Sequence, residues 1–117
     1  VEQEKWRHQM LDISAWKVAQ VVLMSRELDR AEGELRGFID NLNEDEQASL
    51  VAVMWIGRES FLRDELAEAI ATAKSEATSP TADYLLGSPH LSDHLENGMG
   101  ELGISLTDEE SDLIRRG

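Results

Sequence analysis

Residues 43–58 read NEDEQASLVAVMWIGR and decide the fold. Asn43 is a capping side chain, and Glu46, three residues later, can reach back to it, which is the capping-box pattern of a helix start. Residues 50–56 follow without a polar break, so the helix is apolar on more than one side. Gly57 supplies the left-handed residue that commonly ends a helix, and a bend is expected there. The pattern predicts a central, buried helix.

A first helix is expected before this one. Ser14 is a good N-cap, and apolar residues recur at three- and four-residue steps from there to about Arg30. Gly33 and Gly37 interrupt or end that pattern, because each glycine inside a helix costs about 1 kcal/mol relative to alanine. The apolar residues beyond the glycines are therefore expected in a connecting segment: Phe38, Ile39 and Leu42.

Shorter helices are expected after the central one. Ser60 can cap a helix whose apolar stripe runs to about Lys74. Pro80 and Pro89, each preceded by serine, mark two further starts, and Thr107 marks a terminal one. No run of residues alternates apolar and polar as a strand would. The fold class is all-α, a compact bundle of about five or six short helices around the central apolar helix.

The length of 117 residues fits one domain. We expect residues 1–13 to be a poorly ordered N-terminal extension and residues 14–117 to form a single helical domain. The absence of cysteine removes disulfides and thiolate sites and suits a reducing cytoplasm, where we expect the protein to be located. The longest apolar runs fall far short of the roughly 20 residues of a membrane span, so no crossing is expected.

The formal net charge of −13 arises entirely from residues 32–117, because residues 1–31 carry five acidic and five basic side chains. Such a surface repels phosphate backbones and anionic membranes, so we expect neither nucleic acid nor membrane as a partner. A basic protein surface would be attracted, although acidity also simply keeps a small protein soluble.

His90 and His94 are the candidate metal ligands. They lie four residues apart on a predicted helix, so they share one face, with Asp93 and Glu96 nearby in sequence. The pair lacks both the His-Glu-x-x-His arrangement and a third histidine close by. Two solvent-facing imidazoles are the simpler interpretation, so no metal is assigned, and zinc or nickel binding stays an alternative.

No familiar catalytic pattern is present. Acidic clusters at residues 45–46 and 108–110 stand where helix starts favour negative charge, so capping explains them. The chain has no Gly-x-Ser-x-Gly elbow and no Walker-type loop. We therefore expect a non-catalytic protein without catalytic residues or a cofactor.

Trp55 and Arg58 are candidates for an interaction surface, because tryptophan and arginine are over-represented at interface hot spots. Trp16, Val21 and Met24 widen the apolar face of the first helix and favour self-association, for example as a homodimer. The alternative is that these apolar residues are simply the core of the bundle.

Three stretches together resemble a known family. They are LNEDEQ at residues 42–47, LVAVMWIGR at 50–58, and YLLGSP at 84–89 followed by Leu91 and Asp93. In this order they are similar to the bacterial family called domain of unknown function 3775, over about residues 35–103. The resemblance implies a bacterial cytoplasmic protein and carries over no activity, cofactor, partner or catalytic residue. It also implies Gly-Asp after the Gly-Arg pair, where this chain has Glu59 and Ser60.

Three hypotheses follow. The first is a non-catalytic helical binding or assembly module that acts through contacts with a protein partner or a second copy. The second is a metal-binding protein that uses His90 and His94. The third is an acidic regulator that binds a basic protein surface, with an association that weakens with salt.

Overall fold

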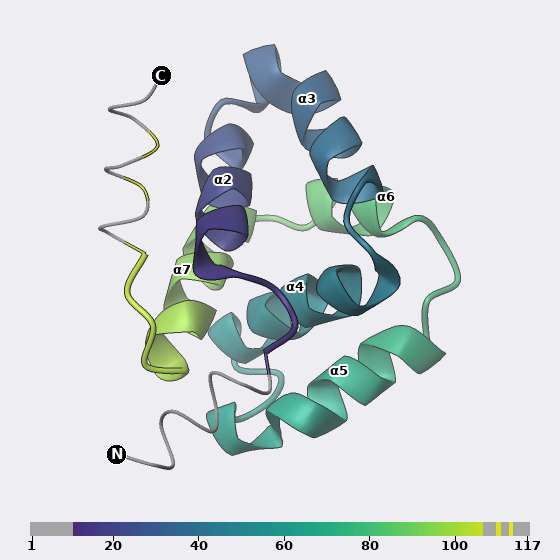
Figure 1. The fold of residues 1–117 in the computed structure, drawn as a ribbon, viewed down its shortest axis with the longest axis vertical. Coiled ribbons are helices and arrows are strands. Elements are labelled where there is room, and N and C mark those ends of the chain that lie inside the picture. The colour runs from purple at the N-terminus through teal and green to yellow at the C-terminus, as the bar shows by residue number, and fades with distance from the viewer. Residues whose placement is uncertain (1–10, 107–109, 111–112, 114–117) are drawn as a thin grey trace.

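The computed structural model describes residues 11–106, Glu110 and Leu113. Within these residues the chain forms six α-helices, one short 3-10 helix and no strand (Figure 1). The elements are α2 (Ala15–Ser25), α3 (Leu28–Asp40), α4 (Glu44–Gly57), η1 (Arg63–Glu65), α5 (Leu66–Ser75), α6 (Thr81–Leu86) and α7 (Leu91–Glu101). The expected all-α bundle is confirmed.

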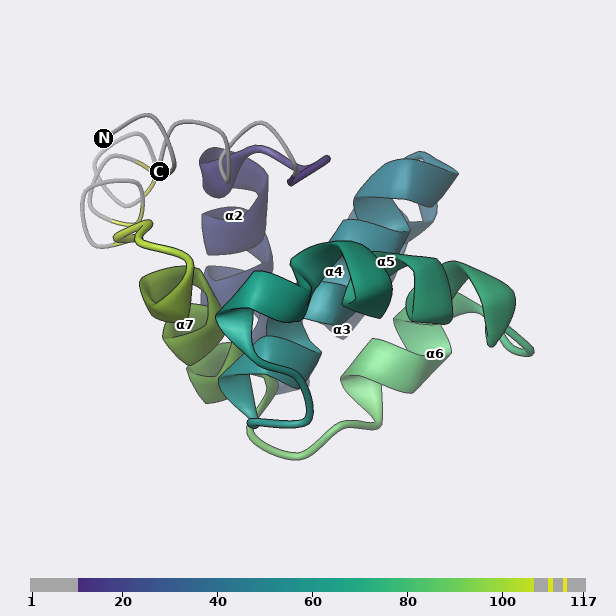
Figure 2. The same cartoon turned by 90° about the horizontal axis from the view of Figure 1, so that it is seen from below.

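Helix α4 is the centre of this bundle. Every residue from Ala48 to Ile56 is buried, on all sides of the helix. α5, α6 and α7 pack against α4, while α2 packs against α3 and α7, and α3 against α6. Figure 1 shows α4 across the middle of the molecule, and Figure 2 shows α5 covering one side of it. The apolar run thus forms the hub that its sequence predicts.

The start of α4 has the predicted capping box. The Asn43 side chain accepts a hydrogen bond from the Glu46 backbone N–H at 2.8 Å, and the Asn43 N–H donates to Glu46 Oε1 at 3.0 Å. Lys17 of α2 donates to Glu46 Oε2 at 2.5 Å. The hydrogen bond from Lys17, then that from the Asn43 backbone, lowers the pKa of Glu46. The cap therefore also ties α2 to α4.

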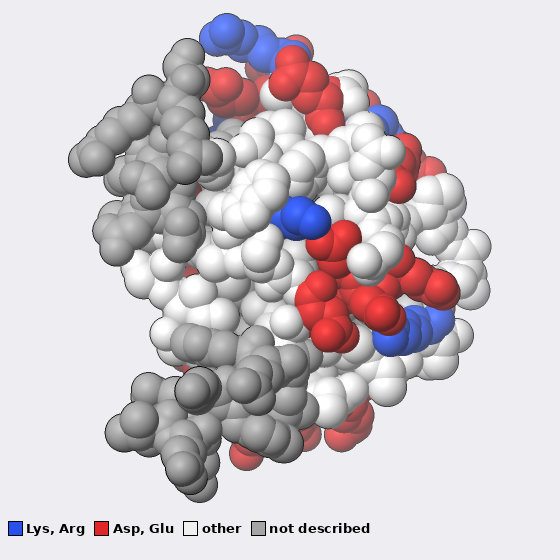
Figure 3. All heavy atoms as spheres, in the orientation of Figure 1, with Lys and Arg blue, Asp and Glu red and all other residues white. Residues whose placement is uncertain are grey.

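Acidic side chains gather near the start of α4, with basic side chains on either side of them (Figure 3). The first turn holds three carboxylates, and Lys74 of α5 pairs with one of them, Asp45, at 2.6 Å. Negative charge at this end of a helix is favoured by the helix dipole. These carboxylates therefore have a structural explanation.

The segment around Gly33 and Gly37 is helical, which corrects the expected connecting segment. Both glycines lie inside α3, and a β-carbon added to either would meet nothing within 4 Å. Leu35 and Ile39 on the same helix are fully buried. Burying such a side chain contributes about 1.5–3 kcal/mol, which outweighs the roughly 1 kcal/mol that each glycine costs. Burial therefore keeps the helix intact.

Gly57 does not have the left-handed conformation that we expected. It is the last residue of α4, and the left-handed residue beyond it is Glu59, with φ of 67°. A β-carbon on Gly57 would lie 1.7 Å from the carbonyl oxygen of His94 in α7, and one on Gly98 would lie 2.1 Å from that of Val53. The two glycines therefore let α4 and α7 cross in main-chain contact.

Ser60 does not cap the next helix. Its hydroxyl accepts a hydrogen bond from Arg58 Nε at 3.0 Å, and the helical segment starts at η1. There the Leu62 backbone N–H donates to Glu65 Oε1 at 2.7 Å. A glutamate three residues on, rather than a serine hydroxyl, satisfies this helix start.

Residues 11–13 pack against the domain, although we expected them in the N-terminal extension. Ile13 is buried, and the Asp12 backbone N–H donates to the buried Ser49 hydroxyl at 3.1 Å. The rest of that extension, residues 1–10, lies outside the described residues, as does most of the expected terminal helix. Over the part of the chain that is described, no helix combines the length and apolar character needed to cross a bilayer.

Candidate binding pocket

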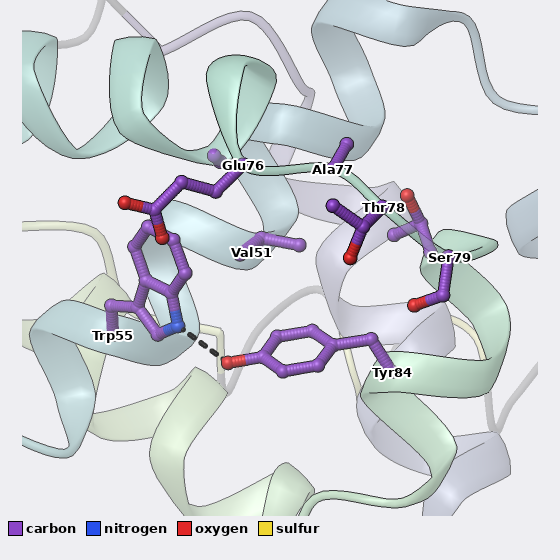
Figure 4. Close-up of a pocket in the computed structure, with 9 residues that line it drawn as sticks. Val51, Trp55, Glu76, Ala77, Thr78, Ser79 and Tyr84 are labelled. Atoms are coloured by element: carbon purple, nitrogen blue, oxygen red, sulfur yellow. Dashed lines mark hydrogen bonds between the residues drawn. The ribbon is translucent and has the colours of Figure 1, made fainter.

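A cavity of about 140 Å³ opens beside α4, between the end of α5 and α6. Val51 and Trp55 form its α4 side, and Tyr84 of α6 forms the opposite wall (Figure 4). Glu76, Thr78 and Ser79 come from the segment that joins α5 to α6. The pocket thus combines an aromatic pair with a polar rim.

The aromatic pair is held by a hydrogen bond. The indole Nε1–H of Trp55 donates to the Tyr84 hydroxyl at 2.8 Å. Phe61 stacks on Trp55 with a centroid distance of 5.5 Å and an angle of 21°, and it does not line the cavity. The indole face that Phe61 covers is therefore closed to a ligand. Trp55 is only 8% exposed, whereas Tyr84 is 37% exposed.

Arg58 approaches the same hydroxyl from the outside. Its Nη2 donates to the Tyr84 hydroxyl at 3.5 Å, while its Nε is bonded to Ser60. The two residues that we selected as an interaction pair, Trp55 and Arg58, therefore meet at Tyr84. Sequence reasoning missed Tyr84, because it lies 29 residues from Trp55 and only the packing of α6 brings them together.

Glu76 is the charged side chain that lines the pocket. Figure 4 shows its carboxylate beside the indole of Trp55. The C-terminal end of α5 also faces the pocket, since Ala73 and the C-cap residue Glu76 line it, and this end of a helix carries partial negative charge. Glu76 is thus the one carboxylate among the residues that line the cavity, and no histidine or lysine is among them.

The candidates on the first helix divide between surface and core. Trp16 is 48% exposed, and its ring meets that of Phe38 edge-on at 6.4 Å. Val21 and Met24 are buried in the core. Of these three interaction candidates, only Trp16 is available at the surface.

The two histidines lie side by side at the start of α7. His90 precedes α7 and has a left-handed backbone, with φ of 60°, while His94 lies inside the helix. Their rings are 6.4 Å apart and nearly perpendicular. Among the described residues, no group of three or more histidine, aspartate or glutamate side chains is placed to hold a metal ion.

Glycines 98, 100 and 103 match the Gly-x-Gly-x-x-Gly spacing of dinucleotide-binding loops. That loop follows a strand and opens a helix, whose N-terminus holds the phosphates. Here the first two glycines lie in the last turn of α7, and Gly103, with φ of 82°, follows its end. The spacing therefore reflects a helix end and the crossing with α4, not a phosphate site.

A second ionisable cluster joins α2 to α7 and Glu110. Arg26 pairs with Glu96 at 2.6 Å and with Glu110 at 3.2 Å. Burial, a hydrogen bond to Glu96 and the charge of Glu96 raise the pKa of Glu110. Burial acts to raise the pKa of Glu96 as well, but hydrogen bonds with Glu110 and Arg26 outweigh it and lower that pKa. The pKa values of the two carboxyl groups are thus shifted in opposite directions.

The fold and the pocket define a small all-α domain with an aromatic cavity beside its central helix. Residues 32–104 match the family described as protein of unknown function DUF3775, and the chain belongs to this family. The matched segment contains most of α3, all of α4 to α7 and every residue that lines the pocket, whereas α2 lies outside it. Searches of curated proteins and of solved structures give no significant match.

Proposed function

We propose that this domain is a non-catalytic binding module and that its pocket receives one side chain of a partner protein. The observation that carries the proposal is the Trp55–Tyr84 pair, which walls a cavity of about 140 Å³. Tryptophan and tyrosine are enriched at interface hot spots, where they line desolvated pockets. Pockets for drug-sized ligands measure roughly 300–1,000 Å³, so this smaller pocket suits a single side chain better.

Preorganisation supports the proposal. Trp55 is fixed by the stack with Phe61 and by its bond to Tyr84, so binding would order few additional side chains. Low ordering cost raises affinity for a given contact area. A cytoplasmic location is part of the proposal and is supported by the absence of cysteine.

The test is a titration of the ¹⁵N-labelled chain with N-acetyl amino acid amides, one for each class of side chain. The indole N–H signal of Trp55, assigned from Trp55→Phe, reports occupancy of the pocket. We expect at least one class to give a saturable shift at Trp55 and at residues 76–79, with little change elsewhere.

Two variants complete this experiment. Tyr84→Ala removes a wall of the pocket and should abolish the shift, whereas Trp16→Ala removes an exposed tryptophan elsewhere and should leave the shift unchanged. The proposal fails when no class produces a saturable shift, or when Tyr84→Ala binds as the wild type does.

A further inference from the structure

We infer that the pocket selects a cationic side chain, such as the ammonium group of lysine. This inference rests on the proposed function and adds the chemistry of the ligand. It is carried by three features of one cavity: two aromatic walls, one carboxylate, and the negative end of a helix.

The aromatic walls are the first feature. Cations are attracted to the faces of aromatic rings, most strongly to tryptophan, and the attraction grows when the site is desolvated. Phe61 covers one face of the Trp55 indole, and Trp55 lines the cavity whereas Phe61 does not. Figure 4 shows the ring of Tyr84 across the cavity from Val51, with its hydroxyl bonded to the indole. A cation in the cavity would therefore contact both aromatic side chains.

The carboxylate is the second feature. Glu76 belongs to none of the ion pairs found within the described residues, so its charge is not neutralised by a lysine or arginine partner. Its place beside Trp55 puts a negative charge at the cavity. A partner ammonium at this position would gain an ion pair with this exposed carboxylate.

The end of α5 is the third feature. Ala73 and Ala77 line the cavity on either side of the helix terminus, where the last carbonyl groups carry partial negative charge. The Thr78 and Ser79 hydroxyls can accept hydrogen bonds from an ammonium group. The net charge of −13 adds long-range attraction for a basic partner.

Arg58 is a positive charge beside the aromatic pair, and it donates to the same Tyr84 hydroxyl as Trp55. It reaches the Tyr84 hydroxyl at 3.5 Å, is exposed, and does not line the cavity. Its charge is therefore directed at the phenol oxygen and solvent rather than at Glu76. An anionic ligand would have to displace or neutralise Glu76, which makes a cation the better fit.

The experiment compares N-acetyl-lysine amide with N-acetyl-norleucine amide, which has a similar chain without the charge. N-acetyl-arginine amide distinguishes a guanidinium from an ammonium. We expect the lysine probe to bind roughly three- to tenfold more tightly than the norleucine probe, read at the Trp55 indole signal. Glu76→Gln should remove most of this difference.

Glu68→Gln is the matched control, because Glu68 is an exposed carboxylate on α5 that does not line the cavity. It removes the same net charge and should leave the preference for lysine intact. Equal binding of lysine and norleucine, or equal effects of Glu76→Gln and Glu68→Gln, would overturn the inference while leaving the binding pocket in place. Saturable binding by none of the amides would overturn the pocket itself. Tighter binding of arginine than of lysine would support cation selection and assign it to guanidinium.

Discussion

Gly57 lies so close to the backbone of His94 that a β-carbon at this position would stand 1.7 Å from the His94 carbonyl oxygen. Gly98 makes the reciprocal approach to Val53 on the opposite helix, at 2.1 Å. Because main-chain atoms cannot move aside as a flexible side chain can, α4 and α7 can only keep this spacing with glycine at both positions. The close crossing of these helices therefore requires that neither Gly57 nor Gly98 is replaced by a residue with a β-carbon.

Gly57→Ala should destabilise the protein by at least ~2 kcal/mol, since overpacking of this kind forces backbone shifts. Gly33→Ala is the matched control, because its β-carbon meets nothing within 4 Å inside α3. That control should stabilise the protein by about 0.5–1 kcal/mol. Urea unfolding followed by far-UV circular dichroism measures both changes. A Gly57→Ala protein as stable as the wild type would show that the crossing is looser than described.

Tyr84→Phe should cost about 0.5–1.5 kcal/mol, because the Trp55 indole N–H loses its acceptor. The indole N–H should also exchange faster with solvent. The comparison is Arg58→Gln, which alters an exposed residue with a long 3.5 Å contact and should change stability by less than about 0.5 kcal/mol. Urea unfolding and indole hydrogen exchange test this together, and an unchanged exchange rate in Tyr84→Phe would contradict it.

Glu46→Gln should destabilise the protein at neutral pH and have no effect in strong acid. The pKa of Glu46 is lowered on folding, so its carboxylate contributes stability above its ordinary value of 4.5, and this contribution is lost as pH falls through the folded pKa. Thermal unfolding from neutral to acid pH measures the difference between variant and wild type. The curves should converge at low pH, and a constant gap would argue against a charged role for Glu46.

Glu110→Gln should change the stability at neutral pH in the opposite direction to Glu46→Gln. The pKa of Glu110 is raised on folding, so its stabilising protonated form is fully populated below the ordinary value of 4.5 and is lost as pH rises through the folded pKa. Glutamine mimics the protonated form, so the variant should be more stable than the wild type at neutral pH and equal to it in acid. Glu96→Gln is the counterpart and should be less stable at neutral pH, because the pKa of Glu96 is lowered. Melting temperatures across the same pH range decide between these outcomes.

The central helix could be predicted because its signals are local. Asn43 and Glu46 cap it within one turn. Residues 50–56 include no polar side chain, so no side of this segment is suited to face solvent. The end of α7 is equally local: Gly103 has φ of 82°, and the Ile104 N–H donates to the Met99 carbonyl at 2.8 Å. Such features depend on neighbours in the chain and need no knowledge of the tertiary structure.

The other glycines show why local reasoning fails elsewhere. Gly33 and Gly37 predict a break in the helix, but the burial of Leu35 favours an uninterrupted α3. Gly57 is expected to have a left-handed backbone, whereas its role is to leave space for the main chain of His94. The sequence alone does not show why a glycine stands at a position. It can be there for a positive φ angle or for the space that its missing side chain leaves, or it can simply be tolerated within a helix.

The pocket could be predicted only in part. Trp55 and Arg58 were selected from residue type, and both lie at the aromatic pair. Tyr84 and Glu76 are not among the candidates from the sequence, because no pattern of neighbouring residues marks either of them as part of a site. Only the contact of α6 with α3 and α4 brings Tyr84 to the tryptophan.

Helix α2 lies outside the family segment and nevertheless supplies part of the core. Val18, Val21 and Val22 are fully buried, and α2 packs against both α3 and α7. A protein trimmed to residues 32–104 would expose the apolar surfaces of α3 and α7 that α2 covers. Such a surface promotes self-association or the binding of a helix from another chain. A truncated protein for labelling, crystallisation or fusion to another protein should therefore begin no later than Leu11. The side chain of Leu11 already packs on the core.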